Sequence, residues 1–280
     1  MLSVIKEGDT IPAKAAEAFG PCRWLISLDY DGTLRSADLN EPNPVDPGFF
    51  GLMTRLRMQG VRWGINTGRP LPYLMEEYLQ IAPFMPDFVC TCERYIYMAD
   101  ETRLLRPELE HNTVAETATQ ELRARLAPEF QAFMLALRHR YPMLHWVFAK
   151  DDPLSIEAED SGTMDDMLPF LEPFMDRWGA DIVQQRAGRY MRLSDARYHK
   201  GSALAHVAAK WNVPADHVVM VGDGHNDLDM FRSFPQGFCA APCTAHAEVK
   251  EYLQANGGYI SPHIGVMEPL MYWRKRILAR

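Results

Sequence analysis

Short, mostly apolar runs alternate with amphipathic stretches at both ends of the chain. Such runs occupy residues 23–28, 61–66, 86–91 and 217–221. Continuous apolar runs of this length are typical of strands buried on both faces of a parallel sheet. The stretches between and after them repeat apolar residues at helical spacing, over residues 49–60, 67–80, 201–213, 222–234 and 247–258. This alternation of strand, turn and helix predicts parallel strands joined by crossover helices.

The middle of the chain has a different rhythm. Residues 95–105 and 181–194 are expected to form hairpins, the second turning at Gly188, and residues 145–150 and 154–159 alternate like paired antiparallel strands. Two helices are expected, one over 114–141 that is interrupted before Pro128 and one over 164–179 despite its prolines. We therefore predict a doubly wound, Rossmann-like α/β core from residues 1–107 and 191–280, with an α+β domain of residues 108–190 inserted into it.

Composition narrows the class of protein. The net charge of −8 over 280 residues argues against a broad nucleic-acid-binding surface. Apolar runs are too short to cross a bilayer, and the first twenty residues lack the continuous apolar segment of a secretory signal. Five cysteines, an odd number, favour a reducing compartment, so we expect a cytoplasmic protein without nucleic-acid or membrane partners. The pairs Cys90/Cys92 and Cys239/Cys243 lack the usual zinc-site spacing, which favours unpaired thiols.

Four groups of polar residues stand where the predicted strands and helices end or begin. Three of them follow strands: Asp29 with Asp31, then Thr67, then Asp223 with Asp227. The fourth, Lys200, begins a helix. Ligands of open parallel sheets bind at the carboxyl ends of the strands, and helix N-termini favour anions. We therefore expect the four groups to meet at one edge of the sheet.

The residue types in this set indicate a magnesium and phosphate site. Crowded carboxylates repel one another unless a cation is present, and oxygen ligands suit Mg²⁺. The Thr67 hydroxyl and the Lys200 ammonium are natural partners of phosphoryl oxygens, while Gly32 and Gly68 let main-chain N–H groups approach a phosphate. A carboxylate would then be available as a nucleophile.

Each group also has a simpler interpretation. "DYDGT" could be a strand-end turn, Thr67 a helix N-cap and Lys200 a solvated surface charge. "GDGHND" could be a cation-binding loop, although it lacks the spacing of an EF-hand. The occurrence of all four groups at the expected structural positions favours a common site.

As a set, these motifs resemble those of the haloacid dehalogenase-like superfamily of phosphohydrolases. "DYDGT" resembles its first motif, Thr67 the second, Lys200 the third and "GDGHND" the fourth. The resemblance implies that Asp29 is the nucleophile and that Asp31 is the general acid and then the base. It also implies that Thr67 and Lys200 hold the phosphoryl oxygens. The Mg²⁺ ligands implied are the Asp29 carboxylate, the Asp31 main-chain carbonyl and Asp223, with Asn226 and Asp227 as their supporting shell.

The insertion between Thr67 and Lys200 resembles the subgroup with an α/β cap, which includes Cof-type sugar-phosphate phosphatases and sucrose-phosphate phosphatases. That subgroup implies hydrolysis of a small phosphorylated metabolite, here expected to be a sugar phosphate. Residues 92–97, "CERYIY", replace the "NGA" segment of many Cof-type relatives. A phosphomutase of the phosphomannomutase type and a non-catalytic sensor of phosphorylated ligands remain alternatives. Arg189, beside the Gly188 turn, is the predicted substrate contact of the cap, ahead of Lys150, Arg186 and Arg192.

Overall fold

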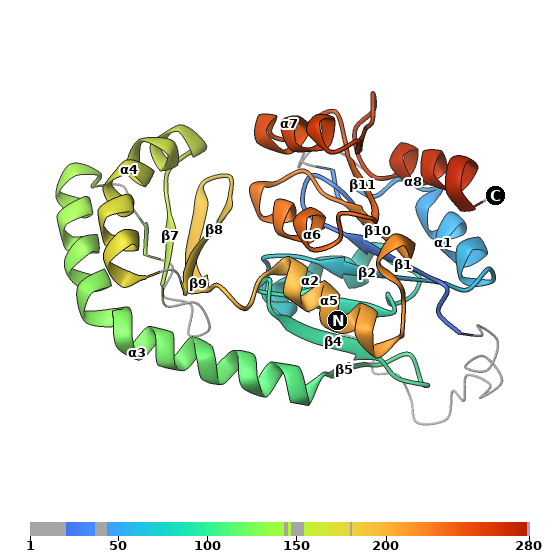
Figure 1. The fold of residues 1–280 in the computed structure, drawn as a ribbon, viewed down its shortest axis with the longest axis horizontal. Helices are drawn as coiled ribbons and strands as arrows, with labels where there is room; N and C mark the ends of the chain where they lie inside the picture. Colours follow the sequence, from blue (N-terminus) through green and yellow to red (C-terminus); the bar gives the residue numbers. More distant parts are fainter. Residues whose placement is uncertain (1–20, 37–43, 143–144, 147–153, 180, 279–280) are drawn as a thin grey trace.

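The computed structural model describes residues 21–36, 44–142, 145–146, 154–179 and 181–278. The described residues form two lobes, which are connected by the long helix α3 (Leu109–Arg140) and by the segment that follows strand β9 (Tyr190–Asp195) (Figure 1). None of the helices in the described ranges has the length and hydropathy that a bilayer crossing requires.

The larger lobe is built on an eight-stranded sheet with the order β12-β11-β10-β1-β2-β3-β4-β5. The strands from β12 to β3 run parallel, and β4 and β5 add an antiparallel edge. This arrangement confirms the predicted Rossmann-like α/β core. The strands are β1 (Trp24–Leu28), β2 (Val61–Asn66), β3 (Phe88–Thr91), β4 (Tyr95–Ala99), β5 (Leu105–Pro107), β10 (Val218–Val221), β11 (Phe238–Ala241) and β12 (Tyr259–Ile260).

Helices cover both faces of this sheet because its central strands are apolar on both sides. Alternate residues of β1 separate the two layers: Ile26 and Leu28 face one cluster, and Leu25 faces the other. The first layer contains α1 (Phe49–Arg57), α2 (Leu71–Ile81) and α8 (Met267–Trp273). The second layer contains α5 (Lys200–Lys210), α6 (Leu228–Ser233) and α7 (Ala247–Ala255).

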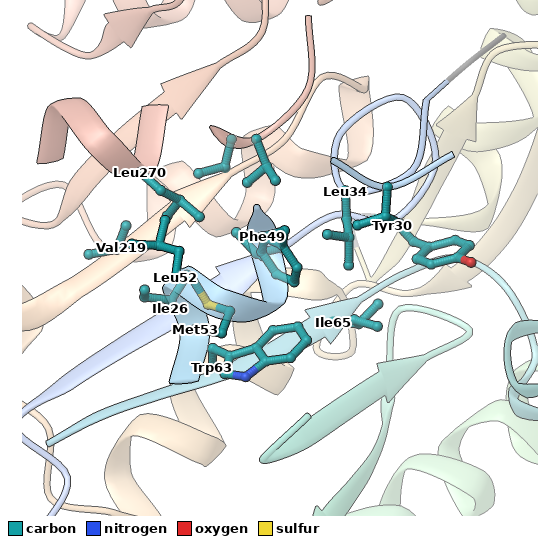
Figure 2. Close-up of a cluster of buried hydrophobic side chains, with 14 of the residues drawn as sticks. Ile26, Tyr30, Leu34, Phe49, Leu52, Met53, Trp63, Ile65, Val219 and Leu270 are labelled. Carbon is teal, nitrogen blue, oxygen red and sulfur yellow. The ribbon is translucent and has the colours of Figure 1, made fainter. Parts of the chain in front are cut away.

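Figure 2 shows the first of these layers, where Phe49 of α1 and Leu270 of α8 lie among Ile26, Trp63 and Val219 of the sheet. These side chains are fully buried. Burying one side chain of this size contributes roughly 1.5–3 kcal/mol. The layer therefore fixes β1 and β2, whose ends carry two of the predicted motifs.

The smaller lobe comprises a four-stranded antiparallel sheet, helix α4 (Ser161–Trp178) and the C-terminal half of α3. The sheet order is β6-β7-β9-β8, with β6 (His145–Trp146), β7 (Ser155–Glu157) and β8 (Ile182–Ala187). One apolar cluster joins both helices to the sheet, including Phe133 of α3, Leu171 of α4 and Met191 of β9. The first turns of α3 pack instead on the core, where Asn112 exchanges two hydrogen bonds with the main chain of Ile96 (2.7 and 2.8 Å).

Pro128 does not interrupt α3, and in this respect the sequence-based expectation was wrong. The helix runs unbroken from Leu109 to Arg140. Buried residues continue at helical spacing on both sides of the proline, from Leu122 and Leu126 to Phe130. Packing of this stripe offsets the lost hydrogen bond and the steric cost of the proline ring, roughly 3 kcal/mol in a helix interior.

The strand pairing bears on the second boundary of the insertion, which the sequence-based prediction sets at residue 190. β9 pairs with both β7 and β8, so the four-stranded sheet continues to Asp195. A division at residue 190 would separate β8 from its hairpin partner. We therefore propose that the inserted unit extends to Asp195.

Candidate active site

The carboxyl ends of three neighbouring parallel strands bring the predicted residues together. Asp29 directly follows β1, Thr67 directly follows β2, and Asp223 lies two residues after β10. β1 lies between β2 and β10, so its end is flanked by both of the other motifs. The structure places Lys200 at the same edge, as the first residue of α5.

Lys200 is the buried centre of this group. Its Nζ donates to Asp29 Oδ1 at 2.5 Å and to Asp227 Oδ1 at 2.7 Å, and the side chain is fully buried. Burial alone would lower the pKa of Lys200, but the charges of Asp227 and Asp29 outweigh it and the pKa is raised. The ammonium therefore stays charged and orients both carboxylates. The side-chain amide of Asn66 holds the helix start by donating to the Lys200 carbonyl at 2.9 Å.

Both carboxylate oxygens of Asp227 accept hydrogen bonds from the protein. Its Oδ1 accepts from Lys200, and its Oδ2 accepts from the main-chain N–H of Gly224 at 2.8 Å. A Cβ at Gly222 would lie 2.3 Å from Asp227 Cγ, so only glycine fits there. Asp227 thus supports the loop and Lys200 and is poorly placed to serve as a metal ligand.

Asp29 and Asp223 form the crowded part of the site. One carboxylate oxygen from each of Asp29, Asp223 and Asp227 lies within 4.8 Å of the other two. Burial raises the pKa of Asp29 well above its ordinary value, against the opposing charge of Lys200. Burial and the neighbouring Asp227 raise the pKa of Asp223 to about 6. Thr33 Oγ1 donates to Asp223 Oδ1 at 2.7 Å.

Gly32 permits the close approach of the first and fourth motifs. Its φ is +79°, in the region that favours glycine, and a Cβ there would lie 2.4 Å from Asp223 Oδ2. Any larger residue would push Asp223 away from Asp29.

This donor set fits a divalent cation. Asp29 and Asp223 are carboxylates that are costly to ionise side by side, and a bound cation would offset that cost. Oxygen donors of this kind suit Mg²⁺, with water and phosphate completing its coordination. The main-chain carbonyl of Asp31 is the third ligand that the motif resemblance implies.

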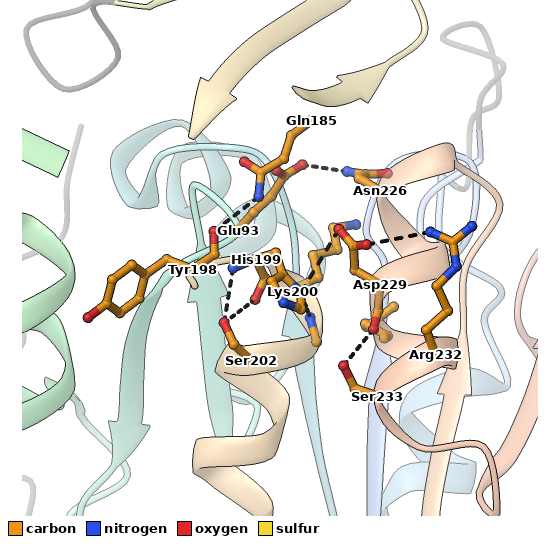
Figure 3. Close-up of polar contacts among 12 residues, drawn as sticks. Glu93, Gln185, Tyr198, His199, Lys200, Ser202, Asn226, Asp229, Arg232 and Ser233 are labelled. Carbon is orange, nitrogen blue, oxygen red and sulfur yellow. Dashed lines mark hydrogen bonds and ion pairs between the residues drawn. The ribbon is translucent and has the colours of Figure 1, made fainter. Parts of the chain in front are cut away.

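The turn between β3 and β4 adds a residue that sequence reasoning missed. Glu93 is buried with a φ of +63°, which is rare for a residue other than glycine. Figure 3 shows Asn226 pointing toward it, and the Asn226 amide donates to Glu93 Oε1 at 2.6 Å. A Cβ at Gly68 would lie 3.2 Å from the same Glu93 oxygen, so the second and fourth motifs meet across this side chain.

Asp31 lies apart from the crowded carboxylates. Its side chain is 46% exposed and forms a two-pronged ion pair with Arg69, at 2.6 Å for each oxygen. Arg69 also donates to Glu77 at 2.7 Å. The main-chain N–H of Arg69 donates to Thr67 Oγ1 at 3.1 Å, so Thr67 stabilises the turn that carries this arginine.

A cavity of about 530 Å³ opens over these residues, between the two lobes. Asp29, Asp31, Thr67, Gly68 and Asp223 line its floor. The remaining lining residues come from nearby loops and from the smaller lobe: Arg69, Pro70, Tyr73, Glu93, Gly188, Tyr190, Arg192, Gly224, Asn226 and His246.

Arg192, one of the four predicted cap candidates, lines this cavity and connects the lobes. It lies buried on β9 and donates to the carbonyls of Cys92 at 2.6 Å and Gly68 at 3.1 Å. It also donates to the hydroxyl of Tyr190, at 3.0 Å. Its guanidinium thus joins the smaller lobe to the turns after β2 and β3.

The other cap candidates lie elsewhere. Arg189 is not among the described residues that line the cavity, because strand alternation turns Tyr190 and Arg192 toward it and Arg189 pairs with Glu157 at 2.7 Å. Arg186 pairs with Asp165 at 2.5 Å, within the smaller lobe. Lys150 lies outside the described residues.

Arg69, Tyr73 and His246 are further cavity residues that sequence reasoning missed. Arg69 stands two residues after Thr67 in "NTGRP", so its position in the second motif was an available signal. Tyr73 and His246 follow no motif, and only the packing of α2 and α7 brings them to the cavity.

Comparison with known proteins agrees with the motif resemblance. A family model described as haloacid dehalogenase-like hydrolase matches residues 146–260. A phosphoglycolate phosphatase from Archaeoglobus fulgidus is 34% identical over 74 residues, covering 26% of this chain and 32% of the relative. The chain thus matches about a third of the length of that curated relative.

Solved structures share the whole fold at low sequence identity. A sucrose-phosphatase from Synechocystis, solved with sucrose and phosphate, superposes with a TM-score of 0.66 at 15% identity, covering 91% of this chain and 98% of that one. A haloacid dehalogenase-like hydrolase from Bacillus subtilis gives a TM-score of 0.57 at 16% identity, covering 90% and 99%. The family model agrees with the resemblance drawn from the motifs, and these likenesses confirm the fold.

Proposed function

A haloacid dehalogenase-like hydrolase model matches residues 146–260, and we propose that the chain is a magnesium-dependent phosphatase of this type that forms an aspartyl-phosphate on Asp29. One observation carries the proposal. Lys200 lies buried between Asp29 and Asp227, and Asp29 and Asp223 line the floor of a cavity large enough for a small metabolite.

In the first step, an Asp29 carboxylate oxygen attacks phosphorus and the bond from phosphorus to the leaving oxygen breaks. Lys200 contacts Asp29 Oδ1 and lies where it could balance the charge of the phosphoryl group. The leaving oxygen takes a proton from Asp31, which must therefore be protonated at this point. Asp29, Asp223 and the Asp31 carbonyl would hold Mg²⁺, which would supply positive charge against the negative phosphoryl oxygens.

In the second step, water attacks phosphorus, gives a proton to Asp31 and releases Asp29 and inorganic phosphate. The pairing of Asp31 with Arg69 supports this role, because it holds the Asp31 side chain within the cavity. Substrate that draws Arg69 toward its own oxygens would release Asp31 from this pair. Arg69 thus links occupancy of the cavity to the position of Asp31.

The cavity supports a small phosphorylated substrate with hydroxyl groups, such as a sugar phosphate. Its walls offer the phenols of Tyr73 and Tyr190 and the guanidinium of Arg69, which suit hydroxyl oxygens. Its size of about 530 Å³ suits a small metabolite, and the smaller lobe would choose the leaving group. The odd number of cysteines favours a cytoplasmic location for such an enzyme.

The test is a phosphate-release screen with Mg²⁺ over a panel of phosphosugars and other phosphometabolites, using wild type and Asp29→Asn in parallel. We expect release by wild type and a loss of at least about 10⁴-fold in kcat for the variant. Circular dichroism would check that the variant is folded. Equal release by both proteins would contradict the assignment of Asp29. Isomerised sugar phosphate without release would indicate a phosphomutase, and binding without either reaction would indicate a sensor.

A further inference from the structure

Two imidazoles and a carboxylate converge beside the catalytic floor without a part in the proposed reaction. His225 is the first residue of the 3₁₀ turn His225–Asp227, His246 immediately precedes α7, and Glu248 lies in the first turn of that helix. One donor atom from each lies within 4.8 Å of the other two. These residues come from two segments about twenty positions apart in the sequence.

The contacts within this group are those of potential metal ligands. His225 Nε2 lies 3.2 Å from Glu248 Oε2, and the rings of His225 and His246 are 4.5 Å apart at 46°. Ligand atoms of a tetrahedral zinc ion with bonds of roughly 2.0–2.1 Å lie about 3.3 Å apart. His225 and Glu248 already have this spacing.

His225 is also incompletely satisfied as a simple polar residue. Its Nδ1 is buried and has no hydrogen-bond partner among the described residues. A buried polar atom in that condition costs roughly 1–3 kcal/mol. A metal ion on Nε2 would place the ring proton on Nδ1, and a water molecule that accepts from Nδ1 would offset this cost.

We propose that His225, His246 and Glu248 bind a zinc ion, separate from the magnesium site of Asp29 and Asp223. Two nitrogens and one oxygen suit Zn²⁺ and disfavour Mg²⁺, and a water molecule would complete the tetrahedron. Arg186 and Asp165 both interact electrostatically with His246, but they form an ion pair without net charge, so they repel a bound cation little.

The site would stiffen the loop that carries the fourth motif. The main-chain N–H of His246 donates to the Asp223 carbonyl at 3.0 Å, and His225 lies between Asp223 and Asn226 in sequence. A metal ion that joins His225 to α7 would therefore hold both segments next to Asp223. β8 of the smaller lobe also packs against the 3₁₀ turn, so the ion would lie near the contact between the lobes.

The test is to measure zinc binding by isothermal titration calorimetry. The full chain is used without an affinity tag and is saturated with Mg²⁺ beforehand. We expect one equivalent of Zn²⁺ to bind wild type, and at least about tenfold weaker binding in His246→Gln and Glu248→Gln. His139→Gln, a change of an exposed histidine on α3, is the matched control and should bind as wild type does.

Cobalt substitution adds a readout that is independent of activity. Co²⁺ in a tetrahedral site absorbs visible light far more strongly than Co²⁺ in an octahedral oxygen site, so wild type should show intense bands that His246→Gln lacks. Asp223→Asn should keep these bands, because it removes a ligand of the other site. Equal Zn²⁺ affinity in wild type and His246→Gln, or loss of binding in Asp223→Asn alone, would overturn the proposal.

Discussion

Asp29 and Asp31 are two residues apart in sequence, yet their carboxylates lie in different environments. Asp29 is buried against Lys200, whereas Asp31 is half-exposed and paired with Arg69. The buried carboxylate is oriented for attack, and the half-exposed one can exchange a proton with substrate and water. This division of environments is what a two-step transfer through Asp29 requires.

We expect the effect of Asp31→Asn on the rate of the first step to depend strongly on the leaving group. An alkyl phosphate needs a proton on its leaving oxygen, so its first step should slow by roughly 10²–10⁴-fold. A nitrophenyl phosphate leaves without a proton, so its first step should slow much less. Rapid-quench measurement of alcohol or nitrophenol release in the first turnover checks this. An equal loss for both substrates would show that Asp31 does not protonate the leaving group.

The raised pKa of Asp223 links the stability of the folded protein to both pH and magnesium. Its pKa is about 6 in the folded protein, above the ordinary 3.8. The metal-free folded protein therefore holds a proton that the unfolded chain has released between these values. The stability from this group is complete below about pH 3.8 and is lost as pH rises through about 6.

Mg²⁺ binds the ionised carboxylates, so it should replace this lost stability above the pKa. We expect Mg²⁺ to raise the Tm clearly at about pH 7.5 and only weakly at about pH 5, where protons compete for Asp223. Differential scanning fluorimetry with Mg²⁺ or EDTA measures the shift. Asp223→Asn should show little shift at either pH. A wild-type shift that is the same at both pH values would count against this assignment.

At the scale of elements, the connection between the lobes depends on β9. Arg192→Met removes the donors to the buried carbonyl of Cys92 and the partly buried carbonyl of Gly68. We expect the free energy of unfolding to fall by about 2–4 kcal/mol. We also expect kcat/KM to fall, because the turns that carry Gly68 and Glu93 lose their anchor. Urea unfolding and steady-state kinetics measure the two effects.

Arg189→Met is the matched control for this prediction. Arg189 lies three residues away, with a side chain that is 57% exposed and paired with Glu157. Its loss should change the free energy of unfolding by no more than about 0.5 kcal/mol. If the two variants behaved alike, the connection assigned to Arg192 would be wrong.

The helices and strands could be predicted from the sequence where the local pattern of apolar and polar residues determines them. Apolar runs located the central strands, and the polar residues at their ends located the motifs. The predicted interruption before Pro128 was wrong because the long-range packing of Phe130 and its neighbours outweighs the local effect of the proline. Helix α8 was not predicted, because its seven residues include Pro269 and are too short for a clear periodicity.

At the scale of the whole molecule, parallel topology made the core of the site predictable, because adjacent strands must end at one edge. The walls of the cavity were not predictable in the same way. Tyr73 and Tyr190 reach it from different lobes, and Arg192 lines it whereas Arg189, the predicted contact beside the Gly188 turn, is not among the described lining residues. Which of these side chains faces the cavity depends on strand alternation and lobe packing, and neither follows from a motif.

The central claim is that a phosphoryl group is carried on Asp29. The most direct test is to mix Asp31→Asn with Mg²⁺ and acetyl phosphate, whose leaving group needs no proton, and to quench in acid. Loss of the base should slow hydrolysis and let the intermediate accumulate. Mass spectrometry of the digested protein should then find one phosphoryl group on Asp29. Turnover by wild type with no phosphoryl group on Asp29 in this variant, or with one on another residue, would contradict the account.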